Sequence, residues 1–333
     1  MLIDSALLQA LEHIVCGSDG SATLLVLNDL DRALVIGGPT GEQLAWIHRA
    51  VDYIEQKSLW IQGVNRAAMD KCQASPNNIL GADIAASLPV LCFPAKRYHA
   101  HEMDILRFQS MIIGSEPTSV PFIIEGAISF WPALTTRKWS SMEYLLQTVG
   151  SHRLVPVELG ARYTDTGWSQ TMMPFGQFLH TIACTPEGSD GECGYLAQHN
   201  LLDHVYKLRR DFVLPDYAFV ETGRRSSGNH AADTDGVAVN VWLGPRGTVS
   251  PLHYDNYDNL FAQVAGCKYF RLFAPSESSN LYPHPRGSLL ENTSRVDIES
   301  INLDTYPRVA DTRYLECIVR PGDLLYIPVS TNI

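Results

Sequence analysis

The stretch from Val239 to Arg271, VNVWLGPRGTVSPLHYDNYDNLFAQVAGCKYFR, decides how the rest of the chain is interpreted. His253 and Asp255 stand two residues apart near its centre. Side chains alternate along an extended strand, so these two are expected to point to the same face. An imidazole and a carboxylate that converge in this way make two of the three protein ligands of a non-haem Fe(II) site. By itself this spacing is more often a surface pair or a cap, so the neighbouring sequence must support the interpretation.

The residues that flank this pair predict β structure. Pro251 suits an edge strand or a bulge, because proline cannot donate to a strand ladder. After the pair, the apolar residues of "NLFAQVAG" alternate, and Gly266 then provides a turn. Tyr269 and Phe273 belong to the strand that follows. The pattern predicts a strand, a tight turn and a second strand.

Several separate motifs accompany the pair and carry a family resemblance. They are "WLGPRGTVSPLHYD" (242–255), Asn259, the run from Gln263 to Phe273, and "LYPH" (281–284). On these motifs the chain resembles the JmjC family of Fe(II)- and 2-oxoglutarate-dependent oxygenases, and most of all its lysine-specific demethylase 8 and arginyl hydroxylase branch. The resemblance extends from about Pro121 to Val329, and includes the stretches 156–170, 194–200 and 289–297.

The resemblance implies a mainly β fold, a double-stranded β-helix of the jelly-roll or cupin-like kind with flanking helices. Residues 1–90 are expected to form a helical N-terminal domain, and residues 91–333 the oxygenase domain, incomplete at its C-terminal end. Apolar residues at helical spacing support the helical part. A first helix is expected to bury Leu7, Leu8, Leu11, Ile14 and Val15, a second Leu44, Ile47, Val51 and Ile54, and a third spans about 57–72.

The resemblance also assigns roles in the site. His253 and Asp255 are the expected metal ligands and catalytic residues, with Fe(II) as metal and 2-oxoglutarate as co-substrate. Lys268 is expected to pair with the distal carboxylate of 2-oxoglutarate, a charge-assisted contact. The other residues expected to line the co-substrate pocket are Asn259, Ser250, Trp242 and Tyr163. Trp242 is equally well interpreted as a core residue, and Tyr163 as a strand aromatic that packs on the core.

The end of the chain departs from the family pattern. The family's second ligand histidine follows a strand that matches Gly322–Val329, and its place falls on Ile333, which cannot bind iron. A truncated or mis-spliced product is the favoured explanation, and a pseudo-enzyme is the other. Whether this chain is an enzyme stays open between two hypotheses. One is an oxygenase that hydroxylates or demethylates a lysine or arginine side chain, and the other is a non-catalytic binding protein with the same scaffold.

Composition narrows the partners and the compartment. The net charge is −11 and no basic stripe is visible, so direct nucleic-acid binding is not expected. A protein or peptide substrate is the expected partner. The chain has no run of about 18 apolar residues, so no membrane span is expected. Seven cysteines without a CxxC spacing fit a reducing compartment, which leaves the nucleus or the cytoplasm.

Overall fold

The computed structural model describes residues 2–16, 20–73, 80, 88–113, 120–160, 162–164, 167–184, 194–220 and 236–333. The chain divides into two compact units. Unit 1 comprises Met1–Leu80, Ser141–Arg210 and Val239–Val249, and unit 2 comprises Gly81–Ser140, Asp211–Ala238 and Ser250–Ile333. The N-terminal helices therefore share a unit with segments of the expected oxygenase domain. The expected division of the chain near residue 90 stays a prediction.

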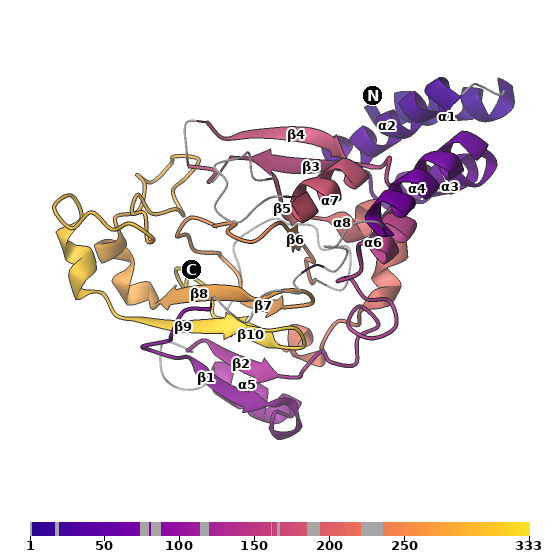
Figure 1. The fold of residues 1–333 in the computed structure, drawn as a ribbon. Coiled ribbons are helices and arrows are strands. Elements are labelled where there is room, and N and C mark those ends of the chain that lie inside the picture. The colour runs from indigo at the N-terminus through magenta and orange to yellow at the C-terminus, as the bar shows by residue number, and fades with distance from the viewer. Residues whose placement is uncertain are drawn as a thin grey trace. The chain divides into compact units, whose positions relative to one another are not determined.

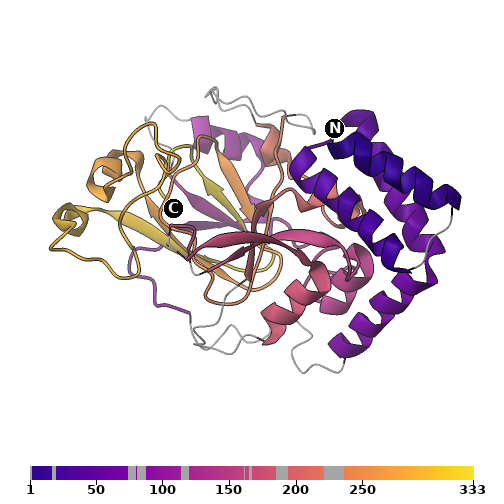
Figure 2. The ribbon, with the colours of Figure 1, turned by 90° about the horizontal axis from the view of Figure 1, so that it is seen from above.

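Unit 1 begins with four helices that lie side by side (Figure 1, Figure 2). They are α1 (Leu2–Cys16), α2 (Gly20–Gly37), α3 (Gly41–Lys57) and α4 (Leu59–Gln73). The expected face of α3 is confirmed for Ile47, Val51 and Ile54, which are buried. The expected face of α1 is wrong for Leu8 and Leu11, which are exposed. Ala6 and Ala10 are buried in their place, because small side chains let α1 approach α2 closely.

The rest of unit 1 contains an antiparallel sheet of strand order β4-β3-β5-β6. Its strands are β3 (Leu154–Leu159), β4 (Ser169–Pro174), β5 (Gly194–His199) and β6 (Val241–Leu243). The helical elements of this part are α6 (Met142–Val149), α7 (Phe175–Cys184), α8 (Leu201–His204) and η2 (Tyr206–Asp211), which runs one residue past the unit. Phe175 and Phe178 of α7 are fully buried.

A buried charge cluster joins α2 to the start of β3 and to α8. Asp31 is 0% exposed, and Arg153 and His204 are each 3% exposed. Asp31 Oδ1 accepts hydrogen bonds from Arg153 Nε at 2.7 Å and from His204 Nε2 at 2.9 Å, and Oδ2 accepts one from the Leu154 amide at 2.8 Å. Burial alone would raise the pKa of Asp31, but Arg153 and His204 outweigh it and hold that pKa well below its usual range.

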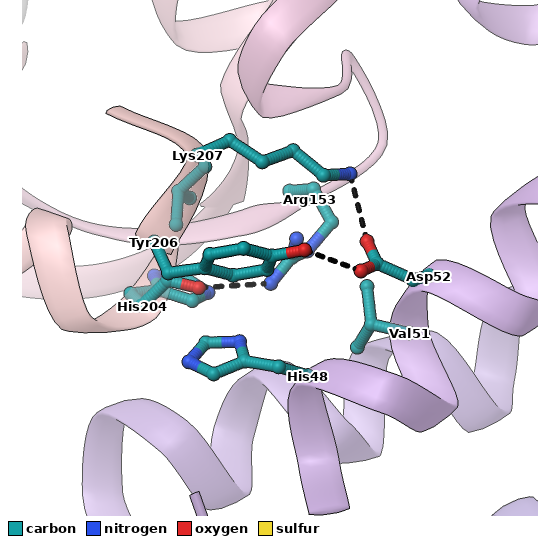
Figure 3. A pocket seen from close by; sticks show the side chains of 8 residues that line it. His48, Val51, Asp52, Arg153, His204, Tyr206 and Lys207 are labelled. Carbon is teal, nitrogen blue, oxygen red and sulfur yellow. Dashed lines mark hydrogen bonds and ion pairs between the residues drawn. The ribbon is translucent and has the colours of Figure 1, made fainter. Parts of the chain in front are cut away.

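Next to this buried charge cluster, a second set of polar contacts joins α3 to η2 (Figure 3). Tyr206 donates its hydroxyl to Asp52 at 2.5 Å, and Lys207 pairs with the same carboxylate at 2.9 Å. His48 stacks obliquely on the ring of Tyr206, with 4.8 Å between the ring centroids. These contacts thus fix α2 to the end of α8, and α3 to η2, through side chains from distant parts of the sequence.

Unit 2 is built around strand β10 (Leu324–Ile327), all four residues of which are buried. The sheet has the order β1-β2-β10-β7, with β1 (Lys96–His99), β2 (Phe122–Glu125) and β7 (Asn259–Ala262). β10 is antiparallel to both of its neighbours, while β1 and β2 are parallel. Strands β8 (Lys268–Phe273) and β9 (Tyr314–Val319) form a separate antiparallel pair. The expected strands on either side of Gly266 are present, but they belong to different sheets.

Helix α5 (Ile105–Ile113) covers one side of this sheet, at its β1–β2 end in Figure 1. Its Phe108 packs edge to face on Phe122 of β2 and on Tyr326 of β10, with ring centroids 5.9 and 5.5 Å apart. The short helical turns of unit 2 are η1 (Ala100–Glu102), η3 (Asp216–Phe219), η4 (Pro275–Leu281) and η5 (Pro307–Asp311). Among the described helices, none has both the length and the apolar character needed to cross a membrane.

The first prediction concerns Asp31. Asp31→Ala leaves Arg153 buried without its carboxylate, which is expected to lower the free energy of unfolding by about 3–5 kcal/mol. The matched control is Asp29→Ala on the same helix, which removes only an exposed pair with Arg32 and should cost about 0.5 kcal/mol. Urea denaturation measures both variants. Equal losses of unfolding free energy in the two variants would contradict a stabilising role of the buried charge cluster.

The second prediction concerns acid sensitivity. Burial, with the nearby charges of Arg153 and His204, lowers the pKa of His48 to about 4, and burial with His204 lowers the pKa of His199 to about 3. The unfolded chain binds protons at these imidazoles near pH 6.5, while the folded chain does not. The free energy of unfolding should therefore have its highest value above about pH 6.5 and should decrease as the pH falls toward 4.

Urea midpoints at pH 7.5 and pH 5.0 measure this dependence. A double variant, His48→Gln with His199→Gln, should show a smaller drop than the wild type. His101→Gln, at an exposed position of unit 2, should leave the drop unchanged. An unchanged drop in the double variant would rule out these two imidazoles as its source.

Candidate metal centre

The His253–Asp255 stretch lies in extended backbone between two other segments of unit 2. The His253 amide donates to the Ile333 carbonyl at 2.9 Å, and the Ile333 amide donates back to His253 at 2.7 Å. On the other side, the Tyr254 amide donates to the Asn292 carbonyl at 3.0 Å. Bridges rather than a long regular strand hold the stretch. The alternation that puts His253 and Asp255 on one face is thus consistent with the observed pairing.

The imidazole of His253 is oriented by its own backbone. Its Nδ1 lies 2.7 Å from the Pro251 carbonyl oxygen. A carbonyl oxygen can only accept, so Nδ1 is the donor, and in the neutral ring Nε2 is then the nitrogen with the lone pair. This is the arrangement usual for metal-binding histidines, in which the second ring nitrogen is held by a carbonyl or carboxylate. Pro251 therefore contributes a fixed acceptor, which its role as a strand-edge residue did not predict.

The carboxylate of Asp255 is oriented in a similar way. Asn259 donates from Nδ2 to Asp255 Oδ2 at 2.7 Å. The Ser330 amide donates to the Asp255 carbonyl at 2.9 Å, so the backbone is held as well. Ligating carboxylates are commonly held by such hydrogen bonds, which fix the direction of the oxygen that binds the metal. Asn259 was expected only as a residue of the co-substrate pocket, and it also contacts the candidate metal ligand Asp255 directly.

Residue 333 lies directly opposite His253. Two residues that exchange both backbone hydrogen bonds form a closely matched antiparallel pair, and their side chains emerge on the same face. The Ile333 side chain packs against a buried apolar cluster that includes Phe270 and Leu272, and Phe261 packs against the same cluster. His253, Asp255 and position 333 therefore share a face, and an imidazole at 333 would be placed toward the other two.

Lys268 lies near the same group of side chains. Its Nζ is 5.9 Å from the ring centroid of Phe261 and 5.8 Å from that of Phe270. Phe261 follows Asn259 by two residues on β7, so the two side chains share a face of that strand. Unit 2 thus brings Lys268, Asn259 and Asp255 into one neighbourhood, although they come from separate strands and turns.

The other expected residues are spread more widely. Ser250 is half-buried and opens the segment of unit 2 that leads to His253. Trp242 and Tyr163 belong to unit 1, on β6 and in the turn after β3. Trp242 is 40% exposed, which does not fit the alternative interpretation as a core residue. Tyr163 is half-buried.

The donor atoms fit Fe(II) at two of its three usual protein positions. One imidazole nitrogen and one carboxylate oxygen are the ligand types of the facial triad, and both have hydrogen-bond partners that orient them. Residue 333, opposite His253, is the expected third position, and its side chain is the hydrocarbon of Ile333, which cannot bind a metal. Across the described ranges, no three His, Cys, Asp or Glu side chains come together in a way that could hold a metal ion.

Comparison with known proteins assigns the chain to a family. A family model for a cupin-like domain matches residues 115–330. Lysine-specific demethylase 8 of Danio rerio is 41% identical over 243 residues, which cover 73% of this chain and 56% of the relative. JmjC domain-containing protein D of Dictyostelium discoideum is 39% identical over 210 residues, covering 62% and 47%. The bifunctional peptidase and (3S)-lysyl hydroxylase JMJD7 of Homo sapiens is 29% identical over 239 residues, covering 62% and 70%.

The chain spans about half the length of the first two relatives. The matched model confirms the expected fold class, a cupin-like domain of antiparallel sheets with flanking helices, preceded by a helical N-terminal region. The chain belongs to the cupin-like JmjC oxygenase family, on the branch that includes proteins named lysine-specific demethylase 8.

Proposed function

We propose that this chain carries the site of an Fe(II)- and 2-oxoglutarate-dependent oxygenase that acts on a protein side chain. The observation that supports this most is the orientation of two candidate ligands on one face. His253 has its Nδ1 proton engaged by Pro251, and Asp255 has one oxygen engaged by Asn259. Hydrogen bonds of this kind are usual for histidines and carboxylates that bind a metal, because they fix the direction of the ligating atom.

The residues of the site would act as follows. When bound, Fe(II) and 2-oxoglutarate would supply, together with O₂, the conversion of a substrate C–H bond to C–OH, with release of succinate and carbon dioxide. His253 Nε2 and an oxygen of Asp255 would hold the metal, and Pro251 and Asn259 would keep both in position. Lys268 would pair with the distal carboxylate of 2-oxoglutarate, where the rings of Phe261 and Phe270 reduce its exposure to water. Ser250 would line the co-substrate pocket of unit 2, and the expected roles of Trp242 and Tyr163, which belong to unit 1, stay predictions.

The substrate class is proposed from the relatives. Their names describe lysine-specific demethylases and a (3S)-lysyl hydroxylase. We take a lysine or arginine side chain of a histone-like or other protein as the substrate. Hydroxylation of an N-methyl carbon would be followed by loss of formaldehyde, which is demethylation, whereas hydroxylation of a carbon in the side chain itself would leave a stable alcohol. A nuclear or cytoplasmic location is consistent with such substrates.

A second candidate function is a non-catalytic binding protein that keeps the same scaffold. Ile333 favours it, because a hydrocarbon occupies the position opposite His253 where a third ligand would stand. Two protein ligands hold a labile divalent ion poorly. The two functions therefore differ in whether this chain catalyses oxidation of a substrate. They do not differ in how its site is built.

The third prediction tests the metal site directly. Ile333→His adds an imidazole on the face of His253 and Asp255, and the affinity for Mn(II), measured by titration calorimetry, should rise about 10-fold or more. Asp255→Ala in the same background should remove this gain. Ile333→Asn serves as a polar control with little ligand strength. Equal affinities of the histidine and asparagine variants would contradict the proposed arrangement.

The fourth prediction separates the two functions. With Fe(II), 2-oxoglutarate and a lysine- and arginine-rich peptide, the unaltered chain should release succinate slowly but above a blank without protein. Asp255→Ala should abolish the release, and Lys268→Met should raise the 2-oxoglutarate concentration needed for half-maximal rate about 10-fold. Succinate at the blank level for the unaltered chain would favour the binding protein.

A further inference from the structure

A sharp turn follows the central strand of unit 2. After β10 ends at Ile327, the Thr331 amide donates to the Pro328 carbonyl at 3.1 Å, which closes a four-residue turn. Ser330, within this turn, has a φ of 61°. This is the left-handed region, which costs a residue other than glycine about 1–2 kcal/mol. Such a conformation persists only where neighbouring contacts hold it.

Asp258 supplies those contacts. Its Oδ1 accepts a hydrogen bond from the Val329 amide at 3.0 Å and another from the Tyr326 hydroxyl at 2.8 Å. Tyr326 is 2% exposed and packs against Phe108, so its hydroxyl is fixed in the core. Asp258 is thus attached both to the last buried residues of β10 and to the turn that follows. Its neighbour Asn259 pairs with Ile327, which keeps Asp258 beside the turn.

The turn sets the register of the segment that faces the candidate ligands. Within the turn, the Ser330 amide donates to the Asp255 carbonyl, and directly after the turn Ile333 exchanges both backbone hydrogen bonds with His253. Asn332 exchanges both bonds with Phe273 on its other side. A slip of one residue in such a pairing would move every side chain to the opposite face. Position 333 would then point away from His253 and Asp255.

We propose that Asp258 is a positioning residue of the metal centre. By accepting from Val329 and Tyr326 it fixes the turn at 328–331, and this fixes residue 333 on the face of His253. Its link to metal binding rests on the proposed function, whereas its link to the turn does not. Asp258 touches neither metal nor substrate in this role. It acts through the backbone that carries the third ligand position.

Amide hydrogen exchange tests the link to the turn. Asp258→Ala should speed exchange of the Ser330 and Ile333 amides at least 10-fold, while the Phe270 amide in the β8–β9 pair should change little. Asp258→Asn keeps an oxygen in the acceptor position and should change these rates less than about 3-fold. If the alanine variant does not fold, Asp258→Ser, with a shorter polar side chain, takes its place. Unchanged exchange at Ser330 and Ile333 would overturn the inference.

Metal binding tests the link to the site. In the Ile333→His background, Asp258→Ala should weaken Mn(II) binding about 10-fold, and Asp258→Asn should restore most of it. If the Ile333→His parent fails to bind Mn(II), the proposed function fails, while the exchange rates still decide whether Asp258 holds the turn. If the parent binds and Asp258→Ala binds equally well, Asp258 has no positioning role.

Discussion

The two backbone hydrogen bonds between His253 and Ile333 are the constraint on which the candidate site depends. Neither residue lies in a long regular strand, so the pairing is not imposed by an extended ladder. It follows from the position of β10, which is buried between β2 and β7, and from the turn that reverses the chain after Ile327. The site is therefore built from the core outward. Core packing fixes β10, β10 fixes the turn, and the turn fixes the segment opposite the ligands.

Much of this site could be predicted from the sequence, because its signals are local. The spacing of His253 and Asp255 needs only strand alternation, and Gly266 indicates a turn between two strands. The pairing of strands that are distant in the sequence was harder to predict. Nothing local indicates that β7 pairs with β10 while β8 pairs with β9. Asp258 illustrates the same limit, since its value as an acceptor depends on Tyr326 and Val329, 68 and 71 residues later.

The N-terminal helices show where residue patterns were informative and where they were not. The spacing of Ile47, Val51 and Ile54 identified the buried face of α3. Helix α2 (Gly20–Gly37) was missed, although its buried residues Leu27 and Leu30 have helical spacing. In α1 the spacing of the large hydrophobic residues predicted the wrong buried face, because close packing of helices favours the small residues Ala6 and Ala10 at the contact. The partners of Asp31 could not be read from the sequence, since Arg153 is 122 residues away.

The separation between Asp31 and its partners also bears on the order in which the chain can fold. A ribosome releases α2 well before it has made Arg153, and the imidazole of His204 is 173 residues from Asp31. In the folded chain Asp31 is fully buried against these two partners, and burying a lone carboxylate is costly, so α2 cannot complete its packing around Asp31 before they emerge. Final packing of the first helices is thus deferred until the second half of the chain emerges. A nascent chain that stalls before His204 would present these helices loosely packed to chaperones.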